Sequence, residues 1–364
     1  MADESNNRTI EQSNNLYVHF PFCRRKCSYC ALYSRTGVSQ ADRDAYVRRL
    51  AVEIGTEGQT LSASLRTVYF GGGSPALCDL GVLAPALRPL CGEETEFTVE
   101  LHPLDVTPEK LDQLKALGVN RISMGVQSLN DETLADMGRG YTIDAAERAF
   151  ALVKKYFDNV GIDLIVGYPG DEVEKKSRGR QWNLKRLESW GLRHCSVYSL
   201  QNERGLKNVP DDDWTMDRLR HSAECLRAMW LDRYEISNYA VPGYECRHNL
   251  AVWRGEDYVG LGDGACGRIG LERTFSTGAS FVIGASEHPI IRPRVDVVSP
   301  SQDQIERRIF RLRTREGLDA SGHPEWEQVL HKYVQEGLLT REGMIYRLTE
   351  RGMEVCDSIL AELV

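Results

Sequence analysis

Short apolar runs alternate with longer amphipathic stretches from Leu16 to Leu200, and this alternation limits the possible folds more than any other feature of the sequence. Repeated strand–helix units of this kind build a parallel sheet or barrel. The expected strands are Leu16–Phe20, Thr67–Phe70, Glu96–Leu101, Arg121–Gly125, Gly161–Gly167 and Cys195–Leu200. The expected helices are Ala41–Thr56, Leu80–Pro89, Pro108–Leu117, Ile143–Phe157 and Glu172–Trp190. Six strands with intervening helices predict an α/β fold, an incomplete (β/α)6 TIM-like barrel.

The rhythm changes after about residue 205, which predicts further domains. A helix is expected at Asp217–Leu231, followed by Gly-rich loops and short strands through Arg273. From Ser301 the pattern is helix, helix, hairpin and helix, which predicts a small C-terminal winged-helix-like domain. The expected domains are a flexible N-terminus (1–15), a barrel (16–205), a barrel extension with covering loops (206–300) and the C-terminal domain (301–364).

Charge and hydropathy narrow the functional classes. The net charge of -8 argues against a nucleic-acid partner, because phosphate binding needs clustered Lys and Arg. No window offers the run of roughly 18 apolar residues that a membrane span needs, and the segment from Met1 to Asn15 lacks a signal peptide's apolar stretch. We therefore expect a cytoplasmic protein with no transmembrane segment.

Ten cysteines in such a chain suggest metal or redox chemistry where they cluster. Only Cys23, Cys27 and Cys30 do, directly after the first expected strand. Thiolates suit both iron–sulfur clusters and zinc, so the residue types leave two alternatives: a four-iron cluster with one open iron, or a zinc site. Zinc sites usually pair two close dyads, and no second Cys or His dyad follows, which favours the cluster.

The Cys-x3-Cys-x2-Cys loop resembles the mark of the radical S-adenosylmethionine (SAM) superfamily. Further motifs resemble the branch of oxygen-independent coproporphyrinogen dehydrogenases: Tyr17–Cys30, Gly71–Pro75, Arg121–Ser128, Asp163–Pro169 and Tyr234–Asn238. Within that branch, Cys246–Asn249 followed by Trp253, and Arg311–Gly317, resemble the HemW-type heme chaperones. The resemblance covers most of residues 16–350 and implies a radical SAM partial barrel, a 4Fe-4S cluster on the three cysteines, and SAM as cofactor.

Residues for SAM follow from the motifs and the resemblance. Gly72, Gly73 and Ser74 follow a strand, where a glycine backbone can approach a ligand closely. Glu100 and Gln127 end successive strands, where ligands collect in parallel barrels. By resemblance, Tyr17 lies by the cluster, and Glu100, Gln127, Arg139 and Asp163 hold the SAM ribose, carboxylate and neighbouring polar groups. A tight turn for the glycines, and a surface ion pair for Arg139, are the alternatives.

The resemblance also implies heme, as cargo for an apo-hemoprotein recipient. His248, placed in a loop after Pro242-Gly243, and the thiols Cys246 and Cys266 are candidate heme ligands. The sequence departs from the HemW-type pattern at Val252, where Tyr is usual, and at Cys266, where His is frequent.

Three other functions stay open. One is the coproporphyrinogen dehydrogenase itself, whose family carries a further Cys two residues past the triad, whereas Ala31 and Leu32 follow Cys30 here. The others are a different radical SAM reaction and a zinc-bound module. The missing cysteine favours the heme chaperone.

Overall fold

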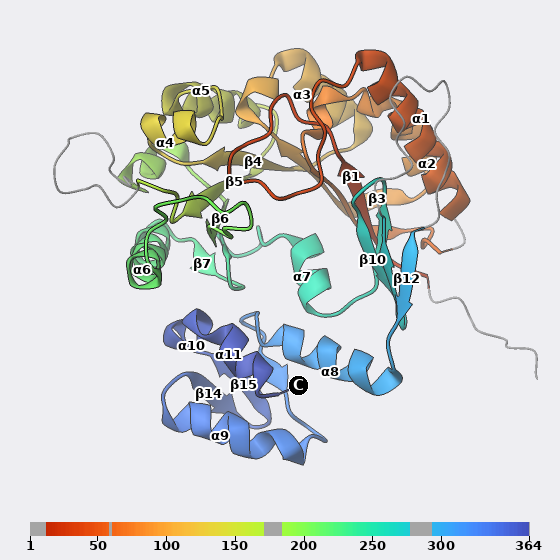
Figure 1. Ribbon diagram of the computed structural model, residues 1–364. Coiled ribbons are helices and arrows are strands. Elements are labelled where there is room, and N and C mark those ends of the chain that lie inside the picture. Colours follow the sequence, from red (N-terminus) through yellow and green to blue (C-terminus); the bar gives the residue numbers. More distant parts are fainter. Residues whose placement is uncertain (1–11, 58–59, 171–183, 277–292, 364) are drawn as a thin grey trace, which may run out of the picture.

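The computed structural model describes residues 12–57, 60–170, 184–276 and 293–363. Within these residues nine strands form one curved sheet, in the order β7-β8-β6-β5-β4-β3-β2-β1-β9 (Figure 1). Its strands are β1 (Asn15–Phe20), β2 (Leu65–Gly72), β3 (Cys91–Leu101), β4 (Arg121–Gln127), β5 (Asn159–Val166), β6 (His194–Ser199), β7 (Asp232–Arg233), β8 (Asn238–Ala240) and β9 (Val259–Leu261). All six expected strands are present, so the predicted α/β partial barrel is confirmed.

The sheet is parallel from β9 through β1 to β6. The strands beyond β6 are antiparallel: β8 pairs antiparallel with β6, and β7 pairs antiparallel with β8. The parallel pairing of β9 with β1 extends the barrel beyond the six strands that were predicted. The carboxyl ends of β1 to β6 therefore meet at one edge, where ligands collect in such folds.

Helices α1 to α5 lie along the outer face of the sheet (Figure 1). The helices up to residue 253 are α1 (Gln40–Thr56), α2 (Ala84–Leu87), α3 (Pro108–Leu117), α4 (Asp131–Asp136), α5 (Ile143–Val153), α6 (Asp212–Ala228) and α7 (Arg247–Trp253). The Thr107 hydroxyl caps α3 by accepting from the Lys110 amide, and Gly118 ends it with a φ of 96°.

Two expected helices differ from the structure. The helix expected at Leu80–Pro89 is divided into a 3-10 turn, Leu80–Leu83, and the short α2, because Pro85 supplies no amide hydrogen to continue the first turn. Of the helix expected at Glu172–Trp190, the first part lies outside the described residues, and the rest, Leu184–Trp190, is a 3-10 helix.

The two faces of the sheet differ in chemistry. In β4, Ile122, Met124 and Val126 are fully buried in the apolar core, towards the helices. The alternate residues Arg121, Ser123, Gly125 and Gln127 line the barrel interior. This period of two gives an apolar outer face and a polar inner face. The fold thus places polar side chains inside the barrel.

The C-terminal residues have the predicted order of elements. The elements are α8 (Pro300–Arg311), β13 (Leu318–Asp319), α9 (Glu327–Gln335), β14 (Leu339–Glu342), β15 (Ile345–Leu348), α10 (Glu350–Glu354) and α11 (Cys356–Ala361). They share a second apolar core, which includes Leu312, Leu330 and Ile359. The domain boundaries at 205/206 and 300/301 remain predictions. Most of the expected flexible N-terminus lies outside the described residues, and Asn15 already belongs to β1.

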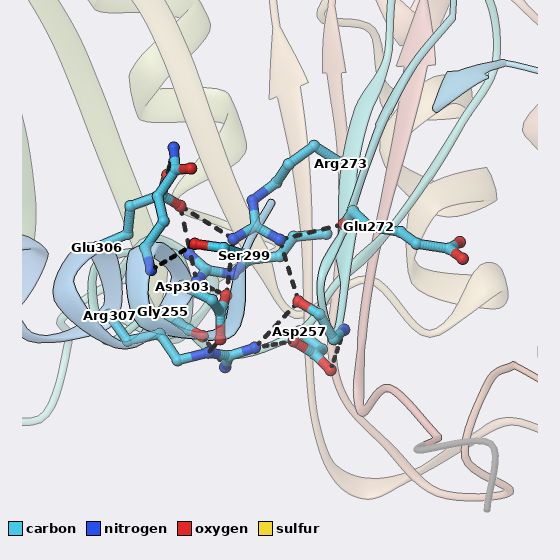
Figure 2. A network of polar contacts seen from close by, with 11 residues as sticks. Gly255, Asp257, Glu272, Arg273, Ser299, Asp303, Glu306 and Arg307 are labelled. Atoms are coloured by element: carbon cyan, nitrogen blue, oxygen red, sulfur yellow. Dashed lines mark hydrogen bonds and ion pairs between the residues drawn. The ribbon is translucent and has the colours of Figure 1, made fainter. Parts of the chain in front are cut away.

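An ion-pair network joins α8 to a small sheet made of β10 (Cys266–Ile269), β11 (Glu272–Phe275) and β12 (Arg294–Val297). The Asp303 carboxylate accepts from Arg268 at 2.6 Å and from Arg273 and Arg307 at 2.7 Å each; Figure 2 shows the last two. Burial by itself raises the pKa of Asp303, but the three arginines outweigh it and lower the pKa to about 2. Asp303 therefore fastens the C-terminal elements to the barrel extension. No helix among the described residues is long and apolar enough to cross a membrane.

Candidate functional site

A cavity of about 800 Å³ runs through the barrel interior, and the cysteine loop after β1 forms part of its wall. It is also lined by the segments that follow β2, β3 and β4, and by inward side chains of β4 to β6. It extends from the carboxyl ends of the strands down to Arg121 and His194, the first residues of β4 and β6. Its volume is typical of sites for small molecules and cofactors.

Glycines after β2 bring the cysteine loop close to the sheet. The Gly73 amide donates to the Phe20 carbonyl at 2.8 Å, and the Ser74 amide donates to the Phe22 carbonyl at 2.7 Å. A Cβ at Gly73 would meet the Phe22 carbonyl oxygen and lie 2.8 Å from that of Phe20. A side chain at Gly73 would therefore displace the base of the loop.

The same segment has little free hydrogen-bonding capacity for a ligand. Gly72, Gly73 and Ser74 all line the cavity, as expected of SAM contacts. The Gly72 amide donates to Glu100 at 3.1 Å, and the Ser74 hydroxyl donates to Asp105. Asp105 also accepts from Arg24 of the cysteine loop at 2.5 Å. The donors of this segment are thus already used by Glu100, Asp105 and the cysteine loop, and the Ser74 carbonyl accepts from the Leu77 amide at 3.1 Å.

The three loop thiols are donors that suit an iron–sulfur cluster. Cys23, Cys27 and Cys30 are partly buried and all line the cavity. Burial raises the pKa of the Cys23 thiol. Across the described residues, no three Cys, His, Asp or Glu side chains converge tightly enough for one metal ion.

Arg139 connects the thiols to the sheet. Its Nη1 lies 3.4 Å from the Cys27 sulfur, and its Nη2 donates to the Gly125 carbonyl at 2.6 Å. Its Nε donates to the Tyr141 hydroxyl at 3.0 Å, and the side chain is buried. The surface ion pair considered as an alternative is therefore absent from the contacts that Arg139 makes among the described residues.

Two buried carboxyl groups face the cavity between the strands. Glu100 accepts from the Tyr69 hydroxyl at 2.8 Å, and burial, aided by the nearby Asp163, raises the pKa of Glu100 to about 7. Asp163 accepts from the Ser123 hydroxyl at 3.1 Å, and burial raises its pKa as well. Carboxylates of this kind can accept from hydroxyl or amino groups of a ligand.

Gln127 also reaches the cavity, through an unusual backbone conformation. Its φ is 72°, in the left-handed region that non-glycine residues rarely adopt, and the β4–β5 register shifts there. Its side-chain nitrogen lies 2.7 Å from the position that a Cβ of Gly125 would occupy. Gly125 thus makes room for Gln127, and such local strain is typical of ligand sites.

Tyr17 is the one residue of the predicted SAM set that does not line the cavity. Its hydroxyl donates to His19 Nδ1 at 3.0 Å, since His19 Nε2 donates to the Tyr33 carbonyl. Its ring stacks on Tyr69, with centroids 6.0 Å apart, and on His248. Tyr17 therefore belongs to a cluster of three rings with Tyr69 and His248, whose own centroids are 5.2 Å apart.

His248 lies in helix α7, not in the loop that the sequence predicted. The helix forms because Glu96, on β3, accepts from the Arg247 and His248 amides at 3.0 Å each and so caps it. Cys246 precedes the helix and is fully buried, with its thiol 3.7 Å from Glu96. The distant Glu96 provides the cap that the local sequence lacks.

The hydrogen bonds of His248 fix its tautomer. The Thr67 hydroxyl donates to Asn15 at 2.9 Å, so it accepts from His248 Nδ1 at 2.8 Å. Burial, and then the charge of Arg121, lower the pKa of His248 to about 3. The ring is therefore neutral, with its proton on Nδ1 and the Nε2 lone pair available.

Cys266 lies on the same side of the barrel as His248. It is exposed, and its thiol is close enough to Tyr17 and Tyr258 to affect their pKa values. His248 contacts these two tyrosines, with ring centroids 6.3 Å away from each. His248 and Cys266, two of the three predicted heme ligands, thus lie near the same two tyrosines.

Sequence reasoning missed Arg121, His194 and Asn249 as cavity residues. Arg121 was treated only as the first residue of an expected strand and of the Arg121–Ser128 motif, with no role of its own. The alternation along β4 could have placed it on the inner face with Gln127, since the two are six residues apart.

Comparison with known proteins gives the relationships of the chain. Residues 17–176 match the Radical SAM superfamily. The chain is 30% identical over 381 residues to the heme chaperone HemW of Mycobacterium tuberculosis, covering 97% of this chain and 95% of that protein. It is 28% identical over 385 residues to HemW of Lactococcus lactis, covering 98% of each chain.

Among solved structures, the chain resembles coproporphyrinogen III oxidase (HemN) from Escherichia coli, a radical SAM enzyme. The TM-score is 0.80 at 21% identity, over 98% of this chain and 91% of that one. At this identity the likeness shows a shared fold. The match to the chaperones over nearly the full length shows that this chain belongs to the HemW heme chaperone family of the radical SAM superfamily.

Proposed function

We propose that this protein binds heme and delivers it to apo-hemoproteins, with Cys23, Cys27 and Cys30 holding a 4Fe-4S cluster whose open iron takes SAM. The observation that carries the heme part is His248, which burial and the charge of Arg121 keep neutral, and whose Nδ1 proton goes to Thr67, so that Nε2 is deprotonated. A hydrogen bond at the other nitrogen is the usual way in which proteins orient a histidine that ligates iron. The relatives, named heme chaperones, support the same cargo.

The cavity residues support a SAM site beside the cluster. Glu100 and Asp163 offer acceptors, and Gln127 offers both an acceptor and a donor. Arg139 places a positive charge at the Cys27 sulfur, which would stabilise thiolate ligands. A reduced cluster bound to Cys23, Cys27 and Cys30, with SAM beside it, would supply one-electron reductive cleavage of the SAM sulfonium. The protein residues bind, orient and shield these groups.

A cytoplasmic location is part of the proposal. All ten cysteines are free, which suits a reducing compartment.

The first experiment separates the chaperone from a porphyrin-biosynthesis enzyme. Anaerobically reconstituted protein is incubated with SAM, dithionite and coproporphyrinogen III, and the products are analysed by mass spectrometry. We expect no protoporphyrinogen while the cluster stays intact. Its appearance would establish a dehydrogenase and overturn the chaperone proposal. Replacing the three loop cysteines by Ala should abolish the brown absorption; full iron retention would place the ligands elsewhere.

The second experiment tests the heme ligand and delivery. We expect His248→Ala to weaken heme binding and shift the Soret band, and to slow transfer of heme to an apo-hemoprotein. His221→Ala changes an exposed histidine and serves as the matched control. An unchanged heme spectrum and affinity in His248→Ala would assign ligation to another residue.

A further inference from the structure

The inner end of the barrel cavity holds a buried arginine without a hydrogen-bond partner at its Nε. Arg121 is 1% exposed, and it lines the cavity. Within the described residues, Nε is a buried polar atom to which no group hydrogen-bonds. A buried donor left in this way costs roughly 1–3 kcal/mol, and more when it is charged. Such a group is a candidate for a ligand contact.

His194 has a second buried nitrogen without a partner at the same end. Its Nε2 lies 2.8 Å from the Tyr234 hydroxyl, which also accepts from the Cys246 amide at 3.1 Å. Burial and the charge of Arg121 hold the pKa of His194 well below its usual value, so the ring is neutral. Its Nδ1 is buried and has no partner among the described residues.

Gly161 makes room for the His194 ring. It lies on β5, between β4 and β6, and pairs with Ser123 on one side and His194 on the other. A Cβ at Gly161 would lie 2.8 Å from His194 Nδ1. The missing side chain thus lets the His194 side chain, which lines the cavity, pack against the β5 backbone.

This end is separate from the cysteine loop. Arg139, beside the Cys27 thiol, contacts the carbonyl of Gly125, which is four residues along β4 from Arg121. Four residues of a strand span about 13 Å. A SAM molecule seated on the cluster already has Arg139 near it, so Arg121 is placed to serve a group further inside.

Helix α7 adjoins the inner end of the cavity. Asn249 of α7 lines it, together with Ser237. Arg121 lines the same cavity as Asn249, the residue that follows the proposed heme ligand in α7.

We propose that Arg121, aided by His194, forms a carboxylate subsite that receives a propionate of the bound porphyrin. This inference rests on the proposed heme function and adds the group by which the porphyrin is recognised. A guanidinium suits a carboxylate because its planar donors can bind both oxygens.

The test compares paired ligands that differ only in a carboxylate. Hemin is compared with hemin dimethyl ester, and SAM with decarboxylated SAM, on the anaerobically reconstituted full chain. The proteins are the wild type, Arg121→Gln and Arg121→Lys, with thermal unfolding as the folding control. We expect the wild type to bind hemin about ten- to a hundredfold more tightly than its ester. Arg121→Gln should lose this preference and Arg121→Lys should keep part of it, while the SAM pair stays unchanged.

Each other result has a definite meaning. A wild type that binds hemin without preferring it to the ester, or an Arg121→Gln variant that keeps the preference, overturns the subsite and leaves the heme function standing. Loss of discrimination in the SAM pair instead assigns Arg121 to the carboxylate of SAM and also overturns it. A wild type that binds neither porphyrin contradicts the heme function itself. If Arg121→Gln fails to fold, Arg121→Lys decides, because it keeps the buried charge: wild-type discrimination in that variant overturns the proposal.

Discussion

Replacing Glu100 by Gln should raise the stability of the protein relative to the wild type more at high pH than at low pH. Burial raises the pKa of Glu100 from 4.5 to about 7, so the folded chain holds a proton there that the unfolded chain has released. Stability therefore falls as the pH rises from about 4.5 through about 7. The difference between these two pKa values corresponds to about 3 kcal/mol for a fully desolvated group. Because Glu100 borders the open cavity, water reduces this, and we expect about 1–3 kcal/mol.

The assay is urea unfolding of the cluster-free protein at about pH 5 and pH 8.5. The difference in unfolding free energy, Glu100→Gln minus wild type, should increase by that amount between the two pH values. Any constant cost, such as the lost acceptor for Gly72, cancels in this comparison. Glu93→Gln, at an exposed position of the same strand, should follow the wild type. Parallel pH dependence of Glu100→Gln and wild type would refute the reasoning. The same variant should bind SAM more weakly when the cluster is present.

Three further predictions concern the loop, the cluster and the C-terminal contact. Gly73→Ala should lower the unfolding free energy by about 1–3 kcal/mol and reduce the iron and sulfide content, because its Cβ would meet the loop carbonyls. The control Gly55→Ala, whose Cβ meets nothing within 4 Å, should change stability by less than about 1 kcal/mol. Arg139→Gln should make the cluster's midpoint potential more negative in an EPR-monitored titration, since it removes the charge beside Cys27, and an unchanged potential would contradict this. Asp303→Asn should lower stability by about 2–3 kcal/mol near neutral pH, measured by urea unfolding, because a pKa lowered from 3.8 to about 2 corresponds to this free energy. The wild-type contribution, present above about pH 3.8, should fade as the pH falls through about 2.

The barrel could be predicted from the sequence because its signal is local and repeated. Each parallel strand is a short apolar run. The two ends of a helix such as α3 can be read from the local sequence, because Thr107 caps its first turn and Gly118 ends it. The strand β9 could not be found in this way. It has three residues, and its pairing with β1 joins segments that are more than 200 residues apart.

The site was predictable where its residues are neighbours in sequence, where they end successive strands, as Glu100 and Gln127 do, or where the family resemblance supplied them, as for Arg139 and Asp163. The cysteine loop and the glycines after β2 are contiguous motifs, so their proximity needed only the parallel order of β1 and β2. His248 was expected in a loop because α7 has seven residues and no local cap. Its cap is Glu96, on another strand, so this helix depends on the tertiary fold.

The polar interior itself argues for ligand binding from the loop down to the floor of the barrel. A barrel stabilised only by packing would have apolar side chains in its interior. In this chain the apolar side chains of β4 lie on the outer face of the sheet instead. The inner face instead keeps Glu100 and Asp163 with raised pKa values, and Arg121 with a buried donor that no described group satisfies. Each of these groups lowers the stability of the ligand-free fold. A cationic or hydroxyl-bearing ligand beside the carboxyl groups, and an anionic group at Arg121, would relieve all three, so ligand binding should stabilise this chain strongly.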